Sequence, residues 1–286
     1  MIAGFSAGKT ARGGVDIAYS IGGRGPPLVL LHGFPQTRVM WSHVAPKLAE
    51  HRTVICPDLR GYGMSGTPEG TAPYTFREMA GDIRYLVAEL GYETFDLAGH
   101  DRGARVAHRL CLDAPGAVRR VALMDIVPTY TLLSDLRREV AEAYYHWFFL
   151  AQPSPLPERM IGAGPDAYFE ACLAGWGGGT EGFDPALMQA YRAAWRRPET
   201  IRAMCADYRA ALHLDFADDA ASLDARITCP ALVLWGADGV MARWYDVAGV
   251  WAGFCSDMRG AAMPGGHFFV DTHGAETVEV LDQFFD

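Results

Sequence analysis

Residues 99–103 read Gly-His-Asp-Arg-Gly, a run in which two glycines flank a central carboxylate. This run lies between an apolar segment, Phe95–Ala98, and a helix-like segment, Arg102–Asp113. Glycines at these positions let a chain turn sharply from a strand into a helix and hold the central side chain, here Asp101, at the edge of a sheet. A carboxylate in that place attacks saturated carbon and forms an ester that water then hydrolyses. We therefore expect a substrate with a leaving group on sp³ carbon or a strained epoxide ring.

A histidine near the end of the chain is the expected partner of this carboxylate. His267 lies in a Pro-Gly-Gly-His-Phe-Phe loop that follows a short expected strand. A lone histidine is more often structural, but this one follows the nucleophile in the order nucleophile, acid, histidine. Its unperturbed pKa of about 6.5 suits a base that takes a proton from water. We expect His267 to activate the water that attacks the ester.

Two aspartates compete for the role of the acid that orients this histidine. Asp125 ends the apolar run Val121–Met124, and Asp238 follows the run Ala231–Trp235. Both lie at the carboxyl ends of expected strands, where active sites of α/β proteins form. The common Gly-x-x-Asp spacing after the second run places Gly239, and not Asp238, at the acid position. We favour Asp125 and keep Asp238 as the alternative.

Two arginines, Arg102 and Arg105, follow the nucleophile in the first turn of the expected helix, where both can face one side. A cation beside an attacking carboxylate favours its charge and weakens it as a nucleophile. That arrangement makes sense if the arginines bind another anion. Two guanidinium groups would hold a substrate carboxylate through charge-assisted hydrogen bonds. The alternative is that Arg105 forms a salt bridge with the segment inserted into the core.

The expected oxyanion hole is built from backbone groups. The sequence His32-Gly33-Phe34-Pro35 follows the apolar run Leu28–Leu31. The N–H groups of Phe34 and of Arg102, the residue after the nucleophile, are the expected donors. His32 itself is expected to be a structural turn residue.

Short, continuous apolar runs bounded by turn residues are typical of strands that are buried on both faces of a parallel sheet. Helix-like segments between them predict right-handed crossovers and an open α/β sheet. The expected strands are Leu28–Leu31, Val54–Cys56, Phe95–Ala98, Val121–Met124 and Ala231–Trp235, and the expected helices are Trp41–His51, Phe76–Leu90, Arg102–Asp113 and Ala275–Phe285.

The pattern changes between Pro128 and about Ser222, where strand-like runs disappear and aromatic and arginine residues dominate. This stretch is predicted to be a helical cap inserted into the α/β core. The expected core comprises residues 1–127 and 223–286, and the expected cap residues 128–222. Its helix-like segments are Ala141–Phe149, Pro185–Arg196 and Thr200–Leu212.

The amino-acid composition and net charge limit the kinds of molecule that the protein is expected to bind. Half of the 286 residues are apolar, so a substantial core is expected, and the net charge is -9. This negative charge argues against nucleic acid or an anionic membrane surface as partner, and an anionic substrate needs a local positive site.

Cysteine and histidine usage bounds the chemistry further. Six scattered cysteines without a C-x-x-C motif are expected to be reduced thiols, mostly buried. No signal peptide and no apolar run of about 20 residues is visible, so a cytoplasmic protein is expected. The histidines show no metal-binding spacing, and we expect neither a metal nor another cofactor.

Three segments carry a resemblance to a known family: HGFPQTRVMW from His32, GHDRGARVAHRL from Gly99 and PGGHFFVD from Pro264. Together they resemble the fluoroacetate dehalogenases, a branch of the α/β-hydrolases, over nearly the whole chain. The Asp-Arg-Gly-Ala-Arg run is much rarer than the Asp-Trp-Gly elbow of many epoxide hydrolases and haloalkane dehalogenases. The resemblance implies the α/β-hydrolase fold and a homodimer.

The resemblance also implies residue roles. It places the nucleophile at Asp101, the acid at Asp125, the base at His267 and the carboxylate-binding arginines at Arg102 and Arg105. It further implies a halide pocket whose donors match His146, Trp147 and Tyr208. Without the resemblance, His146 and Trp147 would be interpreted as an aromatic helix face packed on the core.

These observations together predict a cofactor-independent dehalogenase of short 2-haloacids, with haloacetate as the best candidate and glycolate plus halide as products. An epoxide hydrolase is the alternative: it would use the same Asp and His with two cap tyrosines, Tyr208 and one of Tyr144, Tyr145 and Tyr191. The arginine pair argues against it, since a neutral epoxide gives those cations nothing to bind. A non-catalytic binding protein is disfavoured because no member of the triad is missing.

Overall fold

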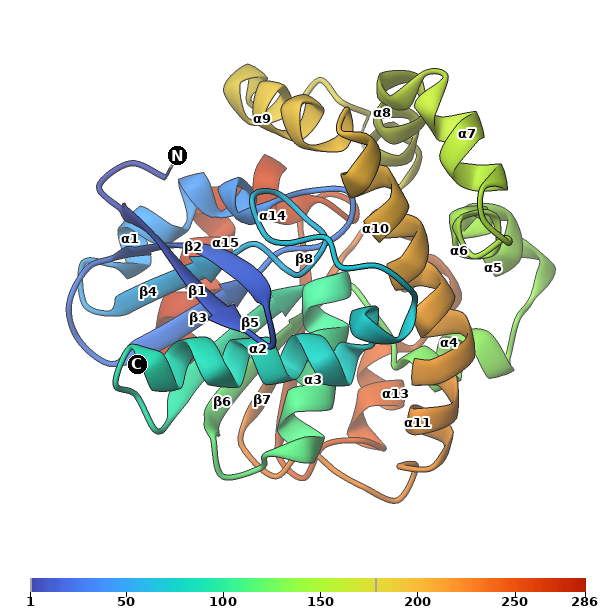
Figure 1. Cartoon of the computed structure of the whole chain (residues 1–286). Helices are drawn as coiled ribbons and strands as arrows, with labels where there is room; N and C mark the ends of the chain where they lie inside the picture. The colour runs from blue at the N-terminus through green and yellow to red at the C-terminus, as the bar shows by residue number, and fades with distance from the viewer. Residues whose placement is uncertain (1, 178) are drawn as a thin grey trace.

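The computed structural model describes residues 2–177 and 179–286 and contains one eight-stranded sheet. The strands are ordered β1-β2-β4-β3-β5-β6-β7-β8; β2 is antiparallel to β1 and β4, and the other neighbours are parallel. Helices α2 and α3 cover one face, and α1 and α15 the other (Figure 1). The strands are β1 (Ser6–Arg12), β2 (Val15–Gly22), β3 (Pro27–Leu31), β4 (Thr53–Pro57), β5 (Phe95–His100), β6 (Val118–Met124), β7 (Ala231–Gly236) and β8 (Met258–Met263).

The central strands form where the sequence predicts them. Every residue of β3, β4 and β5 is buried, as expected for parallel strands with helices on both faces. Strands β1 and β2 lack a continuous apolar run and were not predicted. Their residues pair from Ser6 with Ile21 to Arg12 with Val15 around a turn at Gly13 and Gly14, which both have positive φ. Much of β1 is exposed at the sheet edge, which explains why it carries no buried-strand pattern.

The core helices begin at identifiable signals. Thr75 caps α2 by accepting the Glu78 N–H, the arrangement expected from a Thr-x-x-Glu sequence. The predicted helix Trp41–His51 is wrong: Pro46 interrupts it because proline offers no N–H for a continuous helix. Outside the insertion the helices are η1 (Arg38–His43), α1 (Ala45–Leu48), η2 (Ala72–Tyr74), α2 (Phe76–Glu89), α3 (Arg102–Asp113), α12 (Val240–Trp244), α13 (Val247–Ala252), α14 (Phe269–Thr272) and α15 (Gly274–Phe285).

All described elements between β6 and β7 are helices, and we call them the cap. The predicted segment Ala141–Phe149 is two helices that meet at Tyr144, and α10 continues into a π-helical turn, η3. Helices α5 to α10 lie together beyond one edge of the sheet (Figure 1). The predicted domain boundaries at residues 128 and 222 stay predictions. The cap elements are α4 (Thr129–Ser134), α5 (Arg138–Ala143), α6 (Tyr145–Leu150), α7 (Leu156–Gly162), α8 (Pro165–Gly175), α9 (Pro185–Trp195), α10 (Pro198–Ala210), η3 (Ala211–Asp215) and α11 (Phe216–Ala220).

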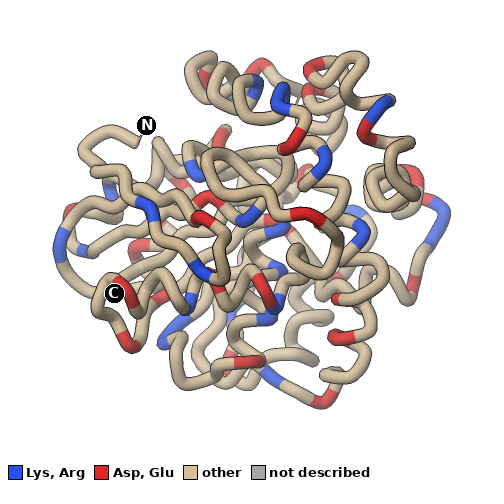
Figure 2. The backbone as a smooth tube through the Cα atoms, in the orientation of Figure 1, with Lys and Arg blue, Asp and Glu red and all other residues tan. Residues whose placement is uncertain are grey.

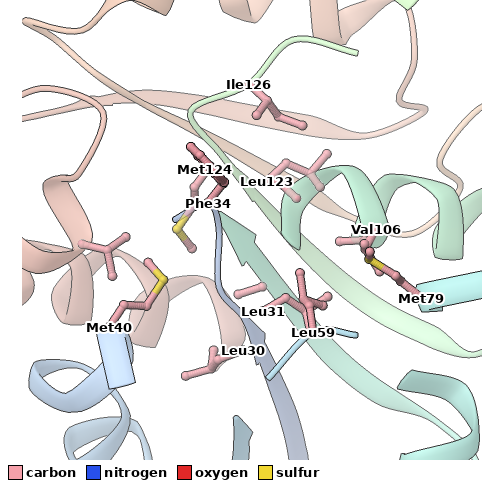
Figure 3. Packing of buried hydrophobic residues seen from close by; sticks show 14 of the residues in the cluster. Leu30, Leu31, Phe34, Met40, Leu59, Met79, Val106, Leu123, Met124 and Ile126 are labelled. Atoms are coloured by element: carbon pink, nitrogen blue, oxygen red, sulfur yellow. The ribbon is translucent and has the colours of Figure 1, made fainter. Parts of the chain in front are cut away.

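An apolar core fixes the ends of the strands. Leu31 of β3 and Leu123 of β6 pack beside Val106 of α3, and Met79 of α2 lies next to them (Figure 3). Each of these four side chains is at most 1% exposed. Burial of such a side chain contributes about 1.5–3 kcal/mol, so the loops that leave this layer are anchored to a rigid base.

The turn between β5 and α3 is tightly constrained. A Cβ on Gly99 would lie 2.4 Å from the Gly103 carbonyl oxygen, and one on Gly103 would lie 2.6 Å from the carbonyl oxygens of Leu31 and His32. Asp101 has φ 49° and ψ −114°, a conformation that side-chain-bearing residues rarely adopt. The two glycines therefore make room for a strained residue at the edge of the sheet.

Charged residues of both signs occur throughout the fold (Figure 2). Acidic and basic residues are interspersed over the fold rather than gathered on one face (Figure 2). No helix in the described ranges is both long enough and apolar enough to cross a bilayer.

We predict that Gly103→Ala lowers the free energy of unfolding by about 2–3 kcal/mol, because the new methyl group meets backbone atoms that cannot move aside. Gly116→Ala is the matched control, since a Cβ there meets nothing within 4 Å. We expect the control to change stability by no more than about 0.5 kcal/mol. Urea titration followed by circular dichroism would measure both; equal midpoints would contradict the steric account.

Candidate active site

Asp101 lies between the end of β5 and the start of α3, at the edge of the sheet that faces the cap. Its Oδ1 accepts the Phe34 N–H at 2.8 Å, and its Oδ2 lies 3.9 Å from His267 Nε2. The side chain of Asp101 is buried, with 6% of the residue exposed. One carboxylate oxygen is thus held by the backbone, while the other faces the histidine.

His267 lies in the loop after β8 and contacts Asp125, at the end of β6. His267 Nδ1 and Asp125 Oδ2 are 2.5 Å apart, and Asp125 Oδ1 accepts the Gly236 N–H at 2.8 Å. With Nδ1 engaged, Nε2 of His267 is buried and has no hydrogen-bond partner. Among the described residues, the alternative acid Asp238 makes a hydrogen bond through its backbone N–H, to Gly265 O at 2.9 Å, and none through its carboxylate. In this structure it is Asp125 that contacts the histidine.

His100, the residue before the nucleophile, also holds the histidine loop. Its Nε2 lies 2.7 Å from the backbone oxygen of His267. Burial lowers the pKa of His100 to about 4, so at neutral pH its ring is uncharged and donates Nε2–H to that oxygen. Sequence reasoning did not assign His100, although its place inside the elbow was a usable signal.

Asp101 and His267 each shift the pKa of the other toward its charged form. Burial would raise the pKa of Asp101, but His267, His100 and Arg102 together with the Phe34 N–H bring it below its ordinary value. Burial would lower the pKa of His267, but Asp125 and then Asp101 raise it above its ordinary value. Asp101 is therefore ionised, as a nucleophilic carboxylate must be.

Arg102 is paired inside the protein. Its Nε donates to Asp207 Oδ2 at 3.0 Å, its Nη2 donates to Asp207 Oδ1, and both residues are fully buried. Tyr62 adds a hydrogen bond to the same carboxylate at 2.6 Å. Within residues 2–177 and 179–286, Nη1 is the one guanidinium nitrogen of Arg102 without a partner. Asp207, from α10, was missed by sequence reasoning because nothing in the chain order links it to the elbow.

Arg105 has a different environment. Its Nη1 donates to Val127 O and to Thr129 Oγ1, both at 3.1 Å, while Nε is buried and without a partner. No carboxylate forms a salt bridge with it among the residues that the structure describes. Burial lowers the pKa of Arg105 to about 10, which leaves it charged at neutral pH. The alternative of a salt bridge to the insertion is thus not seen: in the described ranges Arg105 feels the charge of Asp101 but has no carboxylate at salt-bridge distance.

Three predicted cap residues converge over this site. The ring of Tyr208 lies 5.3 Å from both His146 and Trp147, and Trp147 lies 4.8 Å from the Arg105 guanidinium. His146 Nδ1 and Tyr208 Oη are buried without partners. Burial keeps the pKa of Tyr208 well above its ordinary value and that of His146 well below it, so both are neutral. They form a cluster of uncharged polar groups above Asp101.

The hydroxyl groups of the other cap tyrosines lie in different environments. Tyr144 is buried and its Oη has no partner, as in Tyr208. The Tyr191 hydroxyl is engaged by Asp271 at 2.7 Å, and Tyr145 is 46% exposed. Of the three tyrosines considered for a pair with Tyr208, only Tyr144 has a buried, unengaged hydroxyl.

Comparison with known proteins places this site in a family. The α/β-hydrolase fold family model matches residues 26–274. A fluoroacetate dehalogenase from Burkholderia sp. is 48% identical over 99% of this chain and 95% of its own length. The chain belongs to the α/β-hydrolase fold family, and within it to the fluoroacetate dehalogenase family. This confirms the fold and the family expected from the sequence.

Other relatives of this dehalogenase-family chain carry different names. A soluble epoxide hydrolase from Corynebacterium sp. (strain C12) is 30% identical over 95% of this chain and 94% of its own length. A solved structure described as an α/β hydrolase from Nostoc sp. PCC 7120 has a TM-score of 0.98 and 43% identity, covering 100% of this chain and 99% of its own. The similarity of this chain thus extends to proteins that are not named as dehalogenases.

The dehalogenase-family chain offers no evident metal site. In the ranges 2–177 and 179–286, no group of three or more His, Cys, Asp or Glu side chains is placed to hold a metal ion. The polar groups of the site instead engage one another or are left free for a substrate.

We predict that Arg105→Met raises the free energy of unfolding of the ligand-free protein by about 1 kcal/mol, since it removes a buried cation without a carboxylate. The control is Arg109→Met on the same helix, which breaks the 2.7 Å ion pair with Asp113 and should destabilise the protein. Calorimetry of the ligand-free proteins measures these changes in stability.

Calorimetry with glycolate added measures a second effect, the stabilisation of the protein by a bound carboxylate. Saturating glycolate at 100 times its Kd should stabilise the wild type by about 2.7 kcal/mol but leave the Arg105 variant unchanged; an equal response of both would contradict the assignment.

Proposed function

We propose that this chain hydrolyses short 2-haloacids, with haloacetates including fluoroacetate as the best substrates, to glycolate or a 2-hydroxyacid and halide. At the coarser level it is a hydrolase that acts on carbon–halogen bonds, as the 48% identity to a fluoroacetate dehalogenase along the whole chain supports. The observation that carries the finer proposal is Arg105, a buried cation beside Asp101 that has no carboxylate of its own. A substrate carboxylate is the anion that such a site lacks.

The substrate carboxylate would be held by the free Nε of Arg105 and the free Nη1 of Arg102. Asp207 neutralises the charge of Arg102, so Arg105 supplies most of the electrostatic attraction for the substrate carboxylate. Charge-assisted hydrogen bonds in a buried site are strong and directional. They would fix the α-carbon of a two-carbon acid next to Asp101.

In the first step Asp101 Oδ2 attacks the α-carbon from the side opposite the halogen. A bond forms between Oδ2 and carbon while the carbon–halogen bond breaks, and the halide leaves with the bonding electron pair. His146, Trp147 and Tyr208 would donate hydrogen bonds to the developing halide. Fluoride is small and leaves poorly, so donors placed to receive its charge matter most for this halide; one such donor is typically worth about 10²–10³ in rate.

In the second step His267 takes a proton from water, which adds to the carboxyl carbon of the Asp101 ester. The oxyanion then develops on Oδ1, the atom that already accepts the Phe34 N–H at 2.8 Å. The N–H of Arg102, at the start of α3 where N–H groups lack intrahelical acceptors, would be the second donor. The intermediate then collapses: the bond between the Asp101 carboxyl carbon and Oδ2 breaks, and Oδ2 leaves as the hydroxyl oxygen of the product with the proton that His267 took from water. The oxygen from water completes the Asp101 carboxyl group, which releases its remaining proton to solvent.

Formation of the ester would also prepare His267 for its task. The negative charge of Asp101 is one of the causes that raise the pKa of His267. That charge disappears when Oδ2 is alkylated, which lowers the pKa of the imidazole and favours its neutral, proton-accepting form. Asp125 keeps the ring oriented through both steps.

Epoxide hydrolysis is the second candidate, and the observation that favours it is the pair of unengaged hydroxyls on Tyr144 and Tyr208. Both would donate to an epoxide oxygen. A neutral epoxide would leave Arg105 without an anion, which is the reason that we rank this activity second.

We also propose that the protein forms a homodimer, as expected from the family. The exposed apolar residues Tyr145, Leu156 and Met160, which are 46%, 51% and 59% exposed, lie on neighbouring cap helices and would suit such an interface. A cytoplasmic location, and the expected lack of nucleic-acid and membrane partners, stay predictions.

The direct test measures halide release from fluoroacetate and chloroacetate in parallel with diol formation from styrene oxide. We expect both halides to be released and little diol to form, with Arg105→Gln losing at least about tenfold in kcat/KM for the haloacids. Diol formation without halide release would replace the proposal by the epoxide hydrolase.

The two-step mechanism predicts that His267→Asn still undergoes alkylation but no longer hydrolyses the ester. Mass spectrometry of this variant after incubation with chloroacetate should show one added carboxymethyl group on the peptide that contains Asp101. Asp101→Asn is the control and should gain none. An unmodified His267 variant would mean that attack does not proceed through this carboxylate.

A further inference from the structure

A buried polar cluster outside the reacting groups joins the cap to the core. Asp271 Oδ2 accepts the Gln36 Nε2–H at 2.6 Å, and Asp271 Oδ1 accepts the Tyr191 hydroxyl at 2.7 Å. Gln36 and Tyr191 are fully buried and Asp271 is 6% exposed. The steps of the proposed reaction do not use any of the three.

Each member of this cluster comes from a different segment of the site. Gln36 lies two residues after Phe34, whose N–H holds Asp101 Oδ1. Asp271 lies on α14, four residues after His267. Tyr191 lies on cap helix α9, and both α9 and α14 pack against η1. One carboxylate therefore links the loop of the oxyanion donor, the loop of the base and the cap.

We propose that Asp271 is a positioning residue whose carboxylate holds cap helix α9 against the two core loops that carry Phe34 and His267. This inference rests on the proposed function for its catalytic consequence. We call the hydrogen bonds of Asp271 with Gln36 and Tyr191 the tie. The tie keeps the halide donors of the cap at the correct distance from the nucleophile of the core. Asp271 itself touches neither substrate nor the reacting atoms.

The chemistry of the cluster fits a role in holding the three segments in one fixed arrangement. A buried carboxylate is unfavourable unless it is hydrogen-bonded, and such groups are retained where they define one arrangement of neighbouring elements. Burial raises the pKa of Asp271 to about 7, against the lowering effects of Tyr191, Gln36 and His267. Gln36 Oε1 has no partner in the described part of the chain, so after rotation of its amide it can accept a hydrogen bond from the carboxylic acid. The tie can persist in both protonation states.

Loss of the tie should affect fluoride more than chloride. A small shift of the cap lengthens the hydrogen bonds to the departing halide, and those bonds carry more of the barrier for the poorer leaving group. General loss of folded protein would instead lower both activities by the same factor. The ratio of the two rates therefore separates positioning from stability.

The test variant is Tyr191→Phe, which removes one hydroxyl that donates to Asp271 Oδ1 at 2.7 Å and accepts the Gln36 Nε2–H at 3.4 Å. We expect kcat for fluoroacetate to fall about tenfold and kcat for chloroacetate less than about threefold. Tyr168→Phe is the matched control: it removes a cap hydroxyl that has no hydrogen-bond partner in the described part of the chain, and it should keep the wild-type ratio. An unchanged fluoride-to-chloride ratio in Tyr191→Phe would overturn the inference.

Hydrogen exchange tests the same tie without any turnover. Amides of α9 should exchange faster in Tyr191→Phe than in the wild type or in Tyr168→Phe, and equal exchange would overturn the tie. If the wild type releases no halide, the proposed function fails, whereas the exchange result still decides the positioning role.

A second pair of variants tests whether the hydrogen bonds of the Asp271 side chain are responsible for the effect. Asp271→Asn keeps an acceptor for Tyr191 and a donor for the free oxygen of Gln36, so we expect a near wild-type rate ratio. Asp271→Ala has neither and should behave like Tyr191→Phe. If Asn gave no rescue relative to Ala, hydrogen-bonded positioning by this side chain would be overturned.

Discussion

The charge of one buried carboxylate, Asp101, determines the arrangement around it. An ionised group in a buried site is stable only if neighbours replace its hydration. Here one oxygen is held by the Phe34 N–H, the other faces His267, and Arg102 and Arg105 lie on the helix that follows. The strained turn between β5 and α3 makes this possible because it leaves the side chain at the edge of the sheet, where loops from several strands reach it.

The core and the cap supply different chemistry. The core loops and α3 carry the charges, while the cap residues His146 and Tyr208 are neutral donors whose pKa values burial has shifted away from ionisation. Under the proposed function, fixed charges bind an anionic substrate and neutral dipoles receive the charge that leaves. Asp207 is the exception, since this cap carboxylate neutralises Arg102 and leaves Arg105 as the cation without an internal partner.

The same framework suits two chemistries, which explains why relatives named as epoxide hydrolases share the backbone. Attack by a carboxylate, an oxyanion donor and a histidine base serve an epoxide or a carbon–halogen bond equally well. The difference lies in what the site must neutralise: an epoxide needs proton donors, whereas a haloacid needs a cation. Arg105 satisfies the second requirement, and its burial without an anion would be unfavourable for the first.

Much of the core and the elbow was predictable because they depend on local sequence. Continuous apolar runs marked β3 to β7, and Gly99 with Gly103 marked the strained turn, since only glycine tolerates those close contacts. The hairpin β1–β2 and the break at Pro46 were missed, the first because the edge strand β1 is largely exposed and β2 is only partly buried.

The sequence alone determined residue types and chain order, and thereby the carboxylate chemistry. Only the tertiary structure decided which charges meet: that Asp125 contacts His267, that Asp207 pairs with Arg102 and that Asp271 joins three segments. These partners lie 142, 105 and 235 positions from the groups they hold, counted for Asp271 to Gln36. Such pairings arise from the order of the strands in the sheet and, for Asp207, from the packing of the cap on the core, which no local pattern encodes.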